Sequence, residues 1–138
     1  MIKGISHITF IVHDLGKATL FFDKIFLAEV IYDSGAHSFS VSKERFFRIG
    51  DLWVAAMEGE SLSEKTYNHI AFQIAECDFE EYEKRVEDLG LELRKPRSRV
   101  EGEGRSIYFY DYDNHMFELH TGTLGERLRV YESMKAKR

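Results

Sequence analysis

Hydrophobic and polar residues alternate in two short segments that lie 62 positions apart. The segment His7-Ile8-Thr9-Phe10-Ile11-Val12 aligns with His69-Ile70-Ala71-Phe72-Gln73-Ile74. A period of two is typical of a half-buried strand, so His7, Thr9 and Ile11 share one face of the first predicted strand. The alignment extends without a gap over most of each half of the chain, which indicates an internal repeat.

A predicted helix follows each of these strands, over residues 15–26 in the first half and 79–89 in the second. Gly90 is the expected stop of the second helix. Short strands come next, at 29–32, 38–41, 45–49 and 53–57 in the first half and at 92–95, 106–110 and 116–120 in the second. Turn-forming pairs at 50–51 and 113–114 separate the last strands of each half.

This pattern predicts an α+β fold in which two paired βαβββ modules form an incomplete barrel around a shared cavity. We expect a single domain over residues 1–138, with module one at about 1–62, module two at about 63–124 and a charged helical tail at 125–138. The loop at 96–105 is long and carries Arg97, Arg99 and Arg105. Loops of this length commonly close over binding sites.

Composition narrows the classes of function. The 19 Lys and Arg residues against 24 Asp and Glu residues give a net charge of −5, which argues against a general attraction to nucleic acid or to an anionic membrane. The single cysteine, Cys77, cannot form an internal disulfide, and the N-terminal apolar stretch is interrupted by charged residues and histidines. We therefore expect a cytoplasmic protein.

Three side chains form a candidate metal site: His7, His69 and Glu118. The two histidines occupy equivalent positions in the repeat, and Glu118 lies on the last strand of the second module, so a barrel would bring all three together. Two imidazoles and a carboxylate suit a divalent Mn, Fe, Co, Ni or Zn ion. Ala56 aligns with Glu118, so the first module supplies no fourth ligand, and the open coordination positions favour catalysis.

These motifs resemble the vicinal oxygen chelate superfamily (glyoxalase, bleomycin resistance and dioxygenase proteins), and more closely its fosfomycin resistance branch. The similarity runs through His7-Ile-Thr-Phe, Tyr67-Asn-His69-Ile-Ala-Phe, Ser106-Ile-Tyr-Phe-Tyr-Asp and Asn114-His-Met-Phe-Glu118-Leu-His. The resemblance implies paired βαβββ modules, a homodimer and a divalent metal, most commonly Mn(II), that binds the phosphonate antibiotic and polarises its epoxide.

Within this branch the nucleophile differs between members, and Glu44 favours the FosX-type hydrolases, which add water. In Ser42-Lys43-Glu44-Arg45-Phe46-Phe47, Glu44 matches the general base of the hydrolases, a carboxylate that the thiol transferases lack. Water is a poor nucleophile, so a base that removes its proton assists epoxide opening. Without the resemblance, Glu44 would be read as a solvated carboxylate at a strand edge. The resemblance implies hydrolysis of fosfomycin to a vicinal diol.

The substrate-binding residues expected from the resemblance are Arg127, Ser106 and Tyr108, which match a phosphonate-binding arginine and two hydroxyl donors. Thr9 and Tyr67 lie two residues from the histidines and would point into the same cavity, and Trp53 would form its wall. The sequence leaves open which further arginine contacts the phosphonate. The candidates are Arg94, Arg97, Arg99 and Arg105.

Three alternatives stay open at this point. A thiol transferase of the same branch, using glutathione, cysteine or bacillithiol, would share the metal and phosphonate sites but would not need Glu44. A glyoxalase would call for a carboxylate at Ala56, and a ring-cleaving dioxygenase for a longer chain with additional histidines. A drug-sequestering binding protein would lack the metal ligands.

Overall fold

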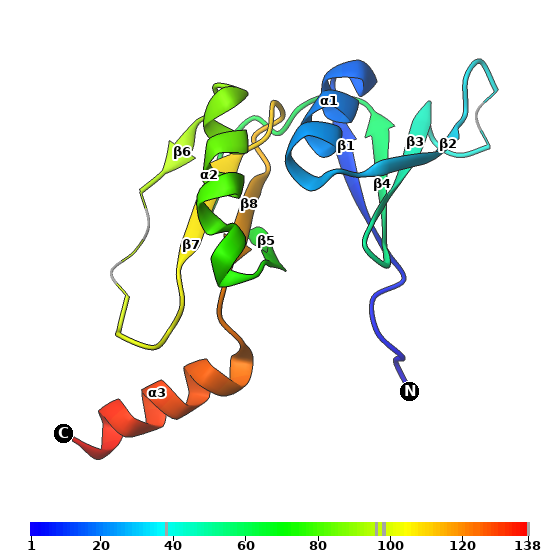
Figure 1. The fold of residues 1–138 in the computed structure, drawn as a ribbon. Helices are drawn as coiled ribbons and strands as arrows, with labels where there is room; N and C mark the ends of the chain where they lie inside the picture. The colour runs from blue at the N-terminus through cyan, green and yellow to red at the C-terminus, as the bar shows by residue number, and fades with distance from the viewer. Residues whose placement is uncertain (38, 96, 98, 138) are drawn as a thin grey trace. The chain divides into compact units, whose positions relative to one another are not determined.

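The chain forms two four-stranded sheets, one in each sequence repeat (Figure 1). The computed structural model describes residues 1–37, 39–95, 97 and 99–137. The predicted α+β class with two βαβββ modules is confirmed. The first module comprises β1 (His7–Val12), α1 (Leu15–Phe26), β2 (Glu29–Asp33), β3 (Glu44–Ile49) and β4 (Leu52–Glu58). The second comprises β5 (His69–Gln73), the short 3-10 helix η1 (Glu76–Asp78), α2 (Phe79–Asp88), β6 (Leu93–Arg94), β7 (Ser106–Tyr110) and β8 (Met116–His120).

The strand order is the same in both sheets, which is the structural counterpart of the sequence repeat. The first sheet runs β1-β4-β3-β2 and the second β5-β8-β7-β6. The first strand of each module pairs in parallel with the last, and the other pairs are antiparallel. In each module the helix lies in the connection between the first two strands, and both of these strands belong to the same mixed sheet.

The chain forms two compact units, Met1–Lys65 with Asp111–Asn114 and Thr66–Tyr110 with His115–Arg138. Asp113 shows why the turn between β7 and β8 belongs to the first unit. Its Oδ1 accepts hydrogen bonds from the N–H of His13 (2.8 Å) and the hydroxyl of Ser61 (2.5 Å), and its carbonyl accepts from the N–H of Leu62 (3.2 Å).

The core of the first unit forms between α1 and one face of its sheet. Asp14 caps the helix by accepting a hydrogen bond from the N–H of Lys17 (3.0 Å). Helical spacing then places Phe21 and Phe22 at 1% exposure, and Phe22 packs against Phe47 of β3 with ring centroids 4.9 Å apart. Burying rings of this size is the main source of stability in a module of this length.

The core of the second unit follows the same plan. Phe109 of β7 and Phe117 of β8 are fully buried and stack with centroids 5.9 Å apart, and Val86 of α2 is also fully buried. The helix ends at Asp88, and the predicted stop, Gly90, follows two residues later with a φ of 64°, the left-handed conformation that glycine adopts without strain.

One predicted strand does not form. Ser38 lies outside the described residues, and residues 39–41 make bends instead of the strand predicted at 38–41. Phe39 and Val41 are 88% and 94% exposed. The reason is that β2 pairs directly with β3, and Ser34 closes the connection by exchanging hydrogen bonds of 3.0 Å with Glu44. The segment between β2 and β3 is therefore a connection and not a strand.

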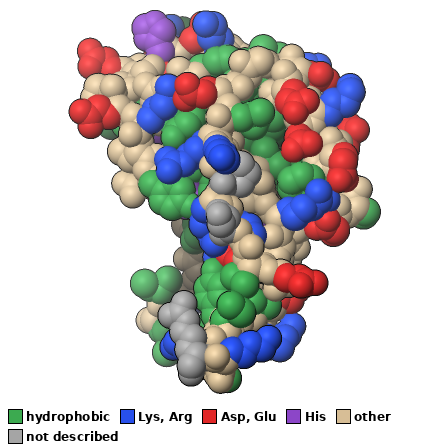
Figure 2. Space-filling model, turned by 90° about the vertical axis from the view of Figure 1, so that its left-hand side faces the viewer, with side chains coloured by type: hydrophobic (Ala, Val, Ile, Leu, Met, Phe, Trp, Pro, Cys, Tyr) green, Lys and Arg blue, Asp and Glu red, His purple; other side chains and the backbone are tan. Residues whose placement is uncertain are grey.

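The predicted helical tail is α3 (Leu124–Ala136), which begins at Thr123, whose hydroxyl accepts from the N–H of Glu126. Within the described part of the chain, α3 has no buried residue, and no helix is long and apolar enough to cross a membrane. Figure 2 shows Lys and Arg side chains interspersed with Asp and Glu on the displayed face. The cytoplasmic location predicted from the sequence stays a prediction.

We expect Phe109→Ala to lower the free energy of unfolding by about 3–5 kcal/mol, because it removes a fully buried ring and leaves a cavity. Urea unfolding followed by circular dichroism measures this. Phe39→Ala is the matched control, since that ring is 88% exposed, and it should change stability little. Equal effects of the two substitutions would contradict this account of the core.

Candidate metal and anion site

Strand register gathers the polar residues of the second unit on one face of its sheet. His69 pairs with Met116, and Glu118 lies between Ala71 of β5 and Tyr108 of β7. Ser106 and His120 pair in the next row. Side chains alternate between faces along a strand, so these residues point to one side and the core phenylalanines to the other. The face predicted to hold the ligands is therefore the one opposite the core.

Glu118 is the centre of this group. It is 4% exposed, and a buried carboxylate is costly unless it is paired or coordinates a metal. Its Oε1 lies 2.9 Å from Nε2 of His69, and its Oε2 accepts a hydrogen bond from the hydroxyl of Ser106 (2.6 Å). Two of the three predicted metal ligands are thus in contact within this unit.

The other ring nitrogen of His69 fixes the orientation of the imidazole. Nδ1 lies 2.6 Å from the carbonyl oxygen of Tyr67, which can only accept, so Nδ1 carries a proton and donates it. Nε2 is then the ring nitrogen that faces Oε1 of Glu118. An imidazole held in this way by a backbone carbonyl is the usual arrangement of a metal-binding histidine.

Ser106 links Glu118 to His120. Its hydroxyl has one proton, which it donates to Glu118, so it accepts from Nδ1 of His120 at 2.7 Å. Nε2 of His120 is left to accept from the guanidinium of Arg127 at 3.3 Å. Burial lowers the pKa of His120, in keeping with a neutral ring. The structure therefore connects the predicted residues Ser106 and Arg127 to Glu118.

Arg99 supplies a positive charge at the same place. One of its terminal nitrogens lies 2.7 Å from both the Ser106 and Tyr108 hydroxyls and 3.4 Å from Oε2 of Glu118. Its Nε is buried and has no hydrogen-bond partner among the described residues. Burial is the main cause that raises the pKa of Tyr108 to about 12, so its hydroxyl stays protonated near neutral pH.

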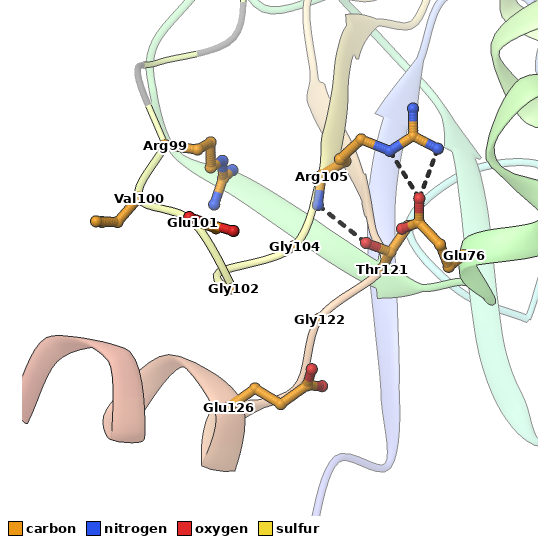
Figure 3. Close-up of a pocket in the computed structure, with 10 residues that line it drawn as sticks. All are labelled: Glu76, Arg99, Val100, Glu101, Gly102, Gly104, Arg105, Thr121, Gly122 and Glu126. Carbon is orange, nitrogen blue, oxygen red and sulfur yellow. Dashed lines mark hydrogen bonds and ion pairs between the residues drawn. The ribbon is translucent and has the colours of Figure 1, made fainter. Parts of the chain in front are cut away.

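The three other candidate arginines are engaged elsewhere. Arg105 pairs with Glu76 (2.6 Å) and points away from Arg99, as the close-up of the adjoining pocket of about 630 Å³ shows (Figure 3). Arg94 lies over the ring of Tyr67, with its guanidinium carbon 4.7 Å from the centroid. Arg97 bonds to Glu103. Of the four, Arg99 makes direct hydrogen bonds to the predicted anion-binding hydroxyls.

Tyr67 stands beside this group. Its ring is 47% exposed and lies 4.8 Å from the ring of His69 and 6.1 Å from that of Tyr108, measured between centroids. The structure thus places Tyr67 next to the predicted ligand His69, within the same unit.

The first unit carries the remaining predicted residues on the equivalent face of its own sheet. His7 stacks on Trp53, with centroids 4.1 Å apart and an interplanar angle of 27°. Thr9 follows on the same exposed face of β1. Nδ1 of His7 lies 3.0 Å from the Ser6 hydroxyl. This leaves Nε2 of His7 as the nitrogen available for a metal.

Glu44 lies on this face too, in the row of Met57 and Ile11. It is 7% exposed, so reading it as a solvated edge carboxylate is wrong. By the repeat, Glu44 corresponds to Ser106, two residues before Phe46 as Ser106 is before Tyr108. The proposed base and the hydroxyl beside Glu118 therefore occupy equivalent positions in the two modules.

The predicted alignment of Ala56 with Glu118 is off by one residue. Ala55 pairs with Thr9 and Phe46, as Glu118 pairs with Ala71 and Tyr108, whereas Ala56 pairs with the core residue Phe10. The cause is one additional residue in the second connection, since five residues separate the paired Tyr110 and Met116, whereas four separate the equivalent pair Arg48 and Trp53. Ala55 supplies no ligand either, so the first module still adds no carboxylate at this position.

Among the described residues, no three His, Cys, Asp or Glu side chains are grouped so that they could hold a metal ion. The second unit contributes the His69–Glu118 pair, and the first contributes His7. The three-ligand site stays a prediction.

Comparison with known proteins gives the family. Residues 4–119 match the model of the glyoxalase/bleomycin resistance protein/dioxygenase superfamily. Fosfomycin resistance protein FosX of Listeria innocua is 63% identical over 131 residues, covering 95% of this chain and 98% of the relative. The chain belongs to the FosX fosfomycin resistance proteins of this superfamily.

A solved FosX structure has the same fold. A glutamate-to-glutamine variant of FosX from Listeria monocytogenes, in complex with Mn(II) and 1S,2S-dihydroxypropylphosphonic acid, superimposes with a TM-score of 0.88 at 58% identity, covering 95% of this chain and 99% of that one. The metallothiol transferase FosB of Bacillus licheniformis is more distant, at 37% identity over 97% of this chain and 85% of its own length. The predicted vicinal oxygen chelate fold is thus confirmed.

One residue of this FosX-group chain escaped the sequence analysis. Glu103 is fully buried and its carboxylate accepts hydrogen bonds from Arg97, Arg99 (3.2 Å), Tyr131 (2.7 Å) and the N–H of Val100 (3.0 Å). Burial alone would raise its pKa, but the hydrogen bonds outweigh burial and lower the pKa from 4.5 to about 2. The feature of the sequence that could have indicated this residue is its position between two glycines in an arginine-rich loop.

Glu103 should make stability depend on pH. A carboxyl whose pKa is lower in the folded state stabilises the fold above its unfolded pKa of 4.5, and this contribution is lost as the pH falls toward 2. We expect Glu103→Gln to lower the free energy of unfolding by about 1–3 kcal/mol near neutral pH and by less near pH 3. Urea unfolding at both pH values checks this, with the exposed Glu101→Gln as control. A deficit independent of pH would contradict it.

Proposed function

We propose that this chain hydrolyses the epoxide of fosfomycin to a vicinal diol in a Mn(II)-dependent reaction. The observation that carries the proposal is the convergence of metal-binding and anion-binding groups on one face of the second sheet. The His69–Glu118 pair supplies the first, and Arg99 with Ser106 and Tyr108 supplies the second. A phosphonate with a neighbouring oxygen is a ligand that needs both.

His7, His69 and Glu118 are the proposed metal ligands. Imidazole and carboxylate donors suit Mn(II) among other divalent ions, and the listeria relative was solved with Mn(II). The fixed tautomer of His69 supports the assignment, because Nε2 is the nitrogen facing Glu118. When bound, the metal supplies Lewis acidity at the epoxide oxygen.

The phosphonate is bound by Arg99 and Arg127, with Ser106, Tyr108 and Tyr67 as hydroxyl donors. A guanidinium presents parallel N–H groups that match phosphonate oxygens, and the buried Nε of Arg99 has no hydrogen-bond partner within the described part of the chain. The sequence left the loop arginine undetermined, and the contacts of Arg99 favour it over Arg94, Arg97 and Arg105. Thr9 and Trp53 of the first module are further proposed substrate contacts, and Trp53 stacks on the proposed ligand His7.

Glu44 is the general base. It removes a proton from water as the water oxygen attacks an epoxide carbon. The carbon–oxygen bond of the ring breaks, and the former epoxide oxygen takes up a proton, so the net change is the addition of one water molecule. The position of Glu44 supports this role, because it is buried on the face of the first sheet that also carries His7 and Thr9.

Two comparisons favour water over a thiol as the nucleophile. Identity is 63% to a FosX protein and 37% to a FosB metallothiol transferase. The ligand in the FosX complex, dihydroxypropylphosphonic acid, is a diol, which is the product of water addition and not of thiol addition.

The deciding experiment is ³¹P NMR of fosfomycin incubated with metal-free protein and then with Mn(II), with and without glutathione or cysteine. We expect diol only with Mn(II) and without any need for thiol. Glu44→Gln should bind Mn(II) normally and lose about 10²–10⁴ in rate, since it removes only the base. His69→Ala should instead lose Mn(II) binding, as followed by electron paramagnetic resonance.

Glu58→Gln, an exposed carboxylate on β4, is the control and should retain both activity and metal binding. A thiol adduct without diol would assign the protein to the transferases. Diol formation by Glu44→Gln at the parent rate would remove Glu44 from the mechanism.

A homodimer accompanies this function in our proposal. Its support is the number of large apolar side chains exposed on the single chain, among them Val30 (44%), Ile31 (40%) and Leu128 (52%). Side chains of this kind are candidates for burial against a second chain. Sedimentation velocity of the Mn(II)-loaded protein at micromolar concentration should give a mass of about two chains. A single-chain mass at all concentrations would exclude the dimer.

A further inference from the structure

A second buried carboxylate, Glu103, lies behind the proposed anion site. It is 0% exposed, in the loop between β6 and β7, and its neighbours Gly102 and Gly104 have φ values of 87° and 91°. These conformations favour glycine and turn the chain so that the Glu103 side chain enters the interior. A fully buried carboxylate needs charged or hydrogen-bonding partners to persist there.

The partners of Glu103 come from separate segments. Oε1 accepts from Arg97, from Arg99 (3.2 Å) and from the hydroxyl of Tyr131 on α3 (2.7 Å), and Oε2 accepts from the N–H of Val100 (3.0 Å). Both oxygens are therefore satisfied. The carboxylate ties the start of the loop to its own end and to the C-terminal helix.

Arg99 joins this carboxylate to Glu118. One terminal nitrogen of its guanidinium bonds Glu103, and the other reaches Ser106, Tyr108 and Glu118. A guanidinium is planar and rigid, so fixing one nitrogen fixes the direction of the other. The place at which Arg99 presents its charge to an anion therefore depends on Glu103.

The loop packs closely against α3 and the residues just before it. A Cβ at Gly104 would lie 2.7 Å from the backbone nitrogen of Gly122, just before α3, and a Cβ at Gly102 would lie 3.0 Å from Val130 (Figure 3 shows the two loop glycines and Gly122). Backbone contact this close, together with the Tyr131 hydrogen bond, holds Glu103 at a set distance from the sheet.

We propose that Glu103, held by Tyr131 of α3, is a positioning residue that sets the guanidinium of Arg99 for phosphonate binding. The inference rests on the proposed function, because it assigns Arg99 to the phosphonate. It adds that α3 takes part in substrate affinity through a residue that does not touch the substrate.

The test is the steady-state kinetics of fosfomycin hydrolysis at saturating Mn(II). We expect Glu103→Gln to raise KM about tenfold or more while kcat changes less than about threefold, because binding of the phosphonate is lost and the base is untouched. Tyr131→Phe removes one hydrogen bond and should raise KM about threefold. The control is Glu101→Gln, an exposed carboxylate two residues away, which should keep the parent KM.

A double-mutant cycle separates positioning from a general structural role. If Glu103 acts through Arg99, Glu103→Gln should change KM by less than about twofold in an Arg99→Ala background. Additive effects would overturn the proposal, as would a parent-like KM in Glu103→Gln. Should Glu103→Gln fail to fold, Tyr131→Phe carries the same cycle, since Tyr131 is 37% exposed.

A binding measurement without turnover distinguishes this inference from the proposed function. Isothermal titration of methylphosphonate into the Mn(II)-loaded protein should show the same loss of affinity in Glu103→Gln and not in Glu101→Gln. If the parent protein binds methylphosphonate in a Glu103-dependent manner but does not hydrolyse fosfomycin, the proposed function fails and the positioning role stands. If the protein hydrolyses fosfomycin but its affinity for methylphosphonate does not depend on Glu103, the proposed function stands and the positioning role fails.

Discussion

The pairing of one buried carboxylate decides the arrangement of the second unit's polar face. Glu118 is 4% exposed in the middle of β8, between β5 and β7, where an unpaired charge would be strongly destabilising. His69 and Ser106 meet its two oxygens, and Arg99 adds a positive charge at 3.4 Å. Each of these groups is also what a metal–phosphonate site requires, so the demands of burial and of binding are met by the same side chains.

The two modules carry different side chains at equivalent positions of this face. Glu118 of the second module corresponds by register to Ala55 of the first, and Ser106 corresponds to Glu44. Among the described residues, each module therefore carries one buried carboxylate on the equivalent face, but in different rows of the sheet. A symmetric fold thereby offers two chemically distinct carboxylates: one in contact with a histidine, and one buried beside the apolar Met57 and Ile11.

Arg99 connects two carboxylates of different kinds. Glu118 belongs to a strand whose position is fixed by the sheet, whereas Glu103 belongs to a loop that is fixed by α3 through Tyr131 and the Gly104–Gly122 contact. The guanidinium between them is the point at which the loop and the sheet meet. This explains why a helix with no buried residue of its own still matters for the polar face of the second unit.

The sequence by itself determined the repeat, most strands and helices, and the candidate ligands His69 and Glu118, because alternation and helical spacing are local properties of the chain. It placed β7 and β8 at their observed bounds for the same reason. The tertiary structure alone decided that Ala55, not Ala56, matches Glu118, that residues 39–41 form no strand, and that Arg99 and Glu103 serve the polar face. These features depend on turn length, on which edges pair and on how far a loop side chain reaches, and they are set by contacts between residues distant in sequence.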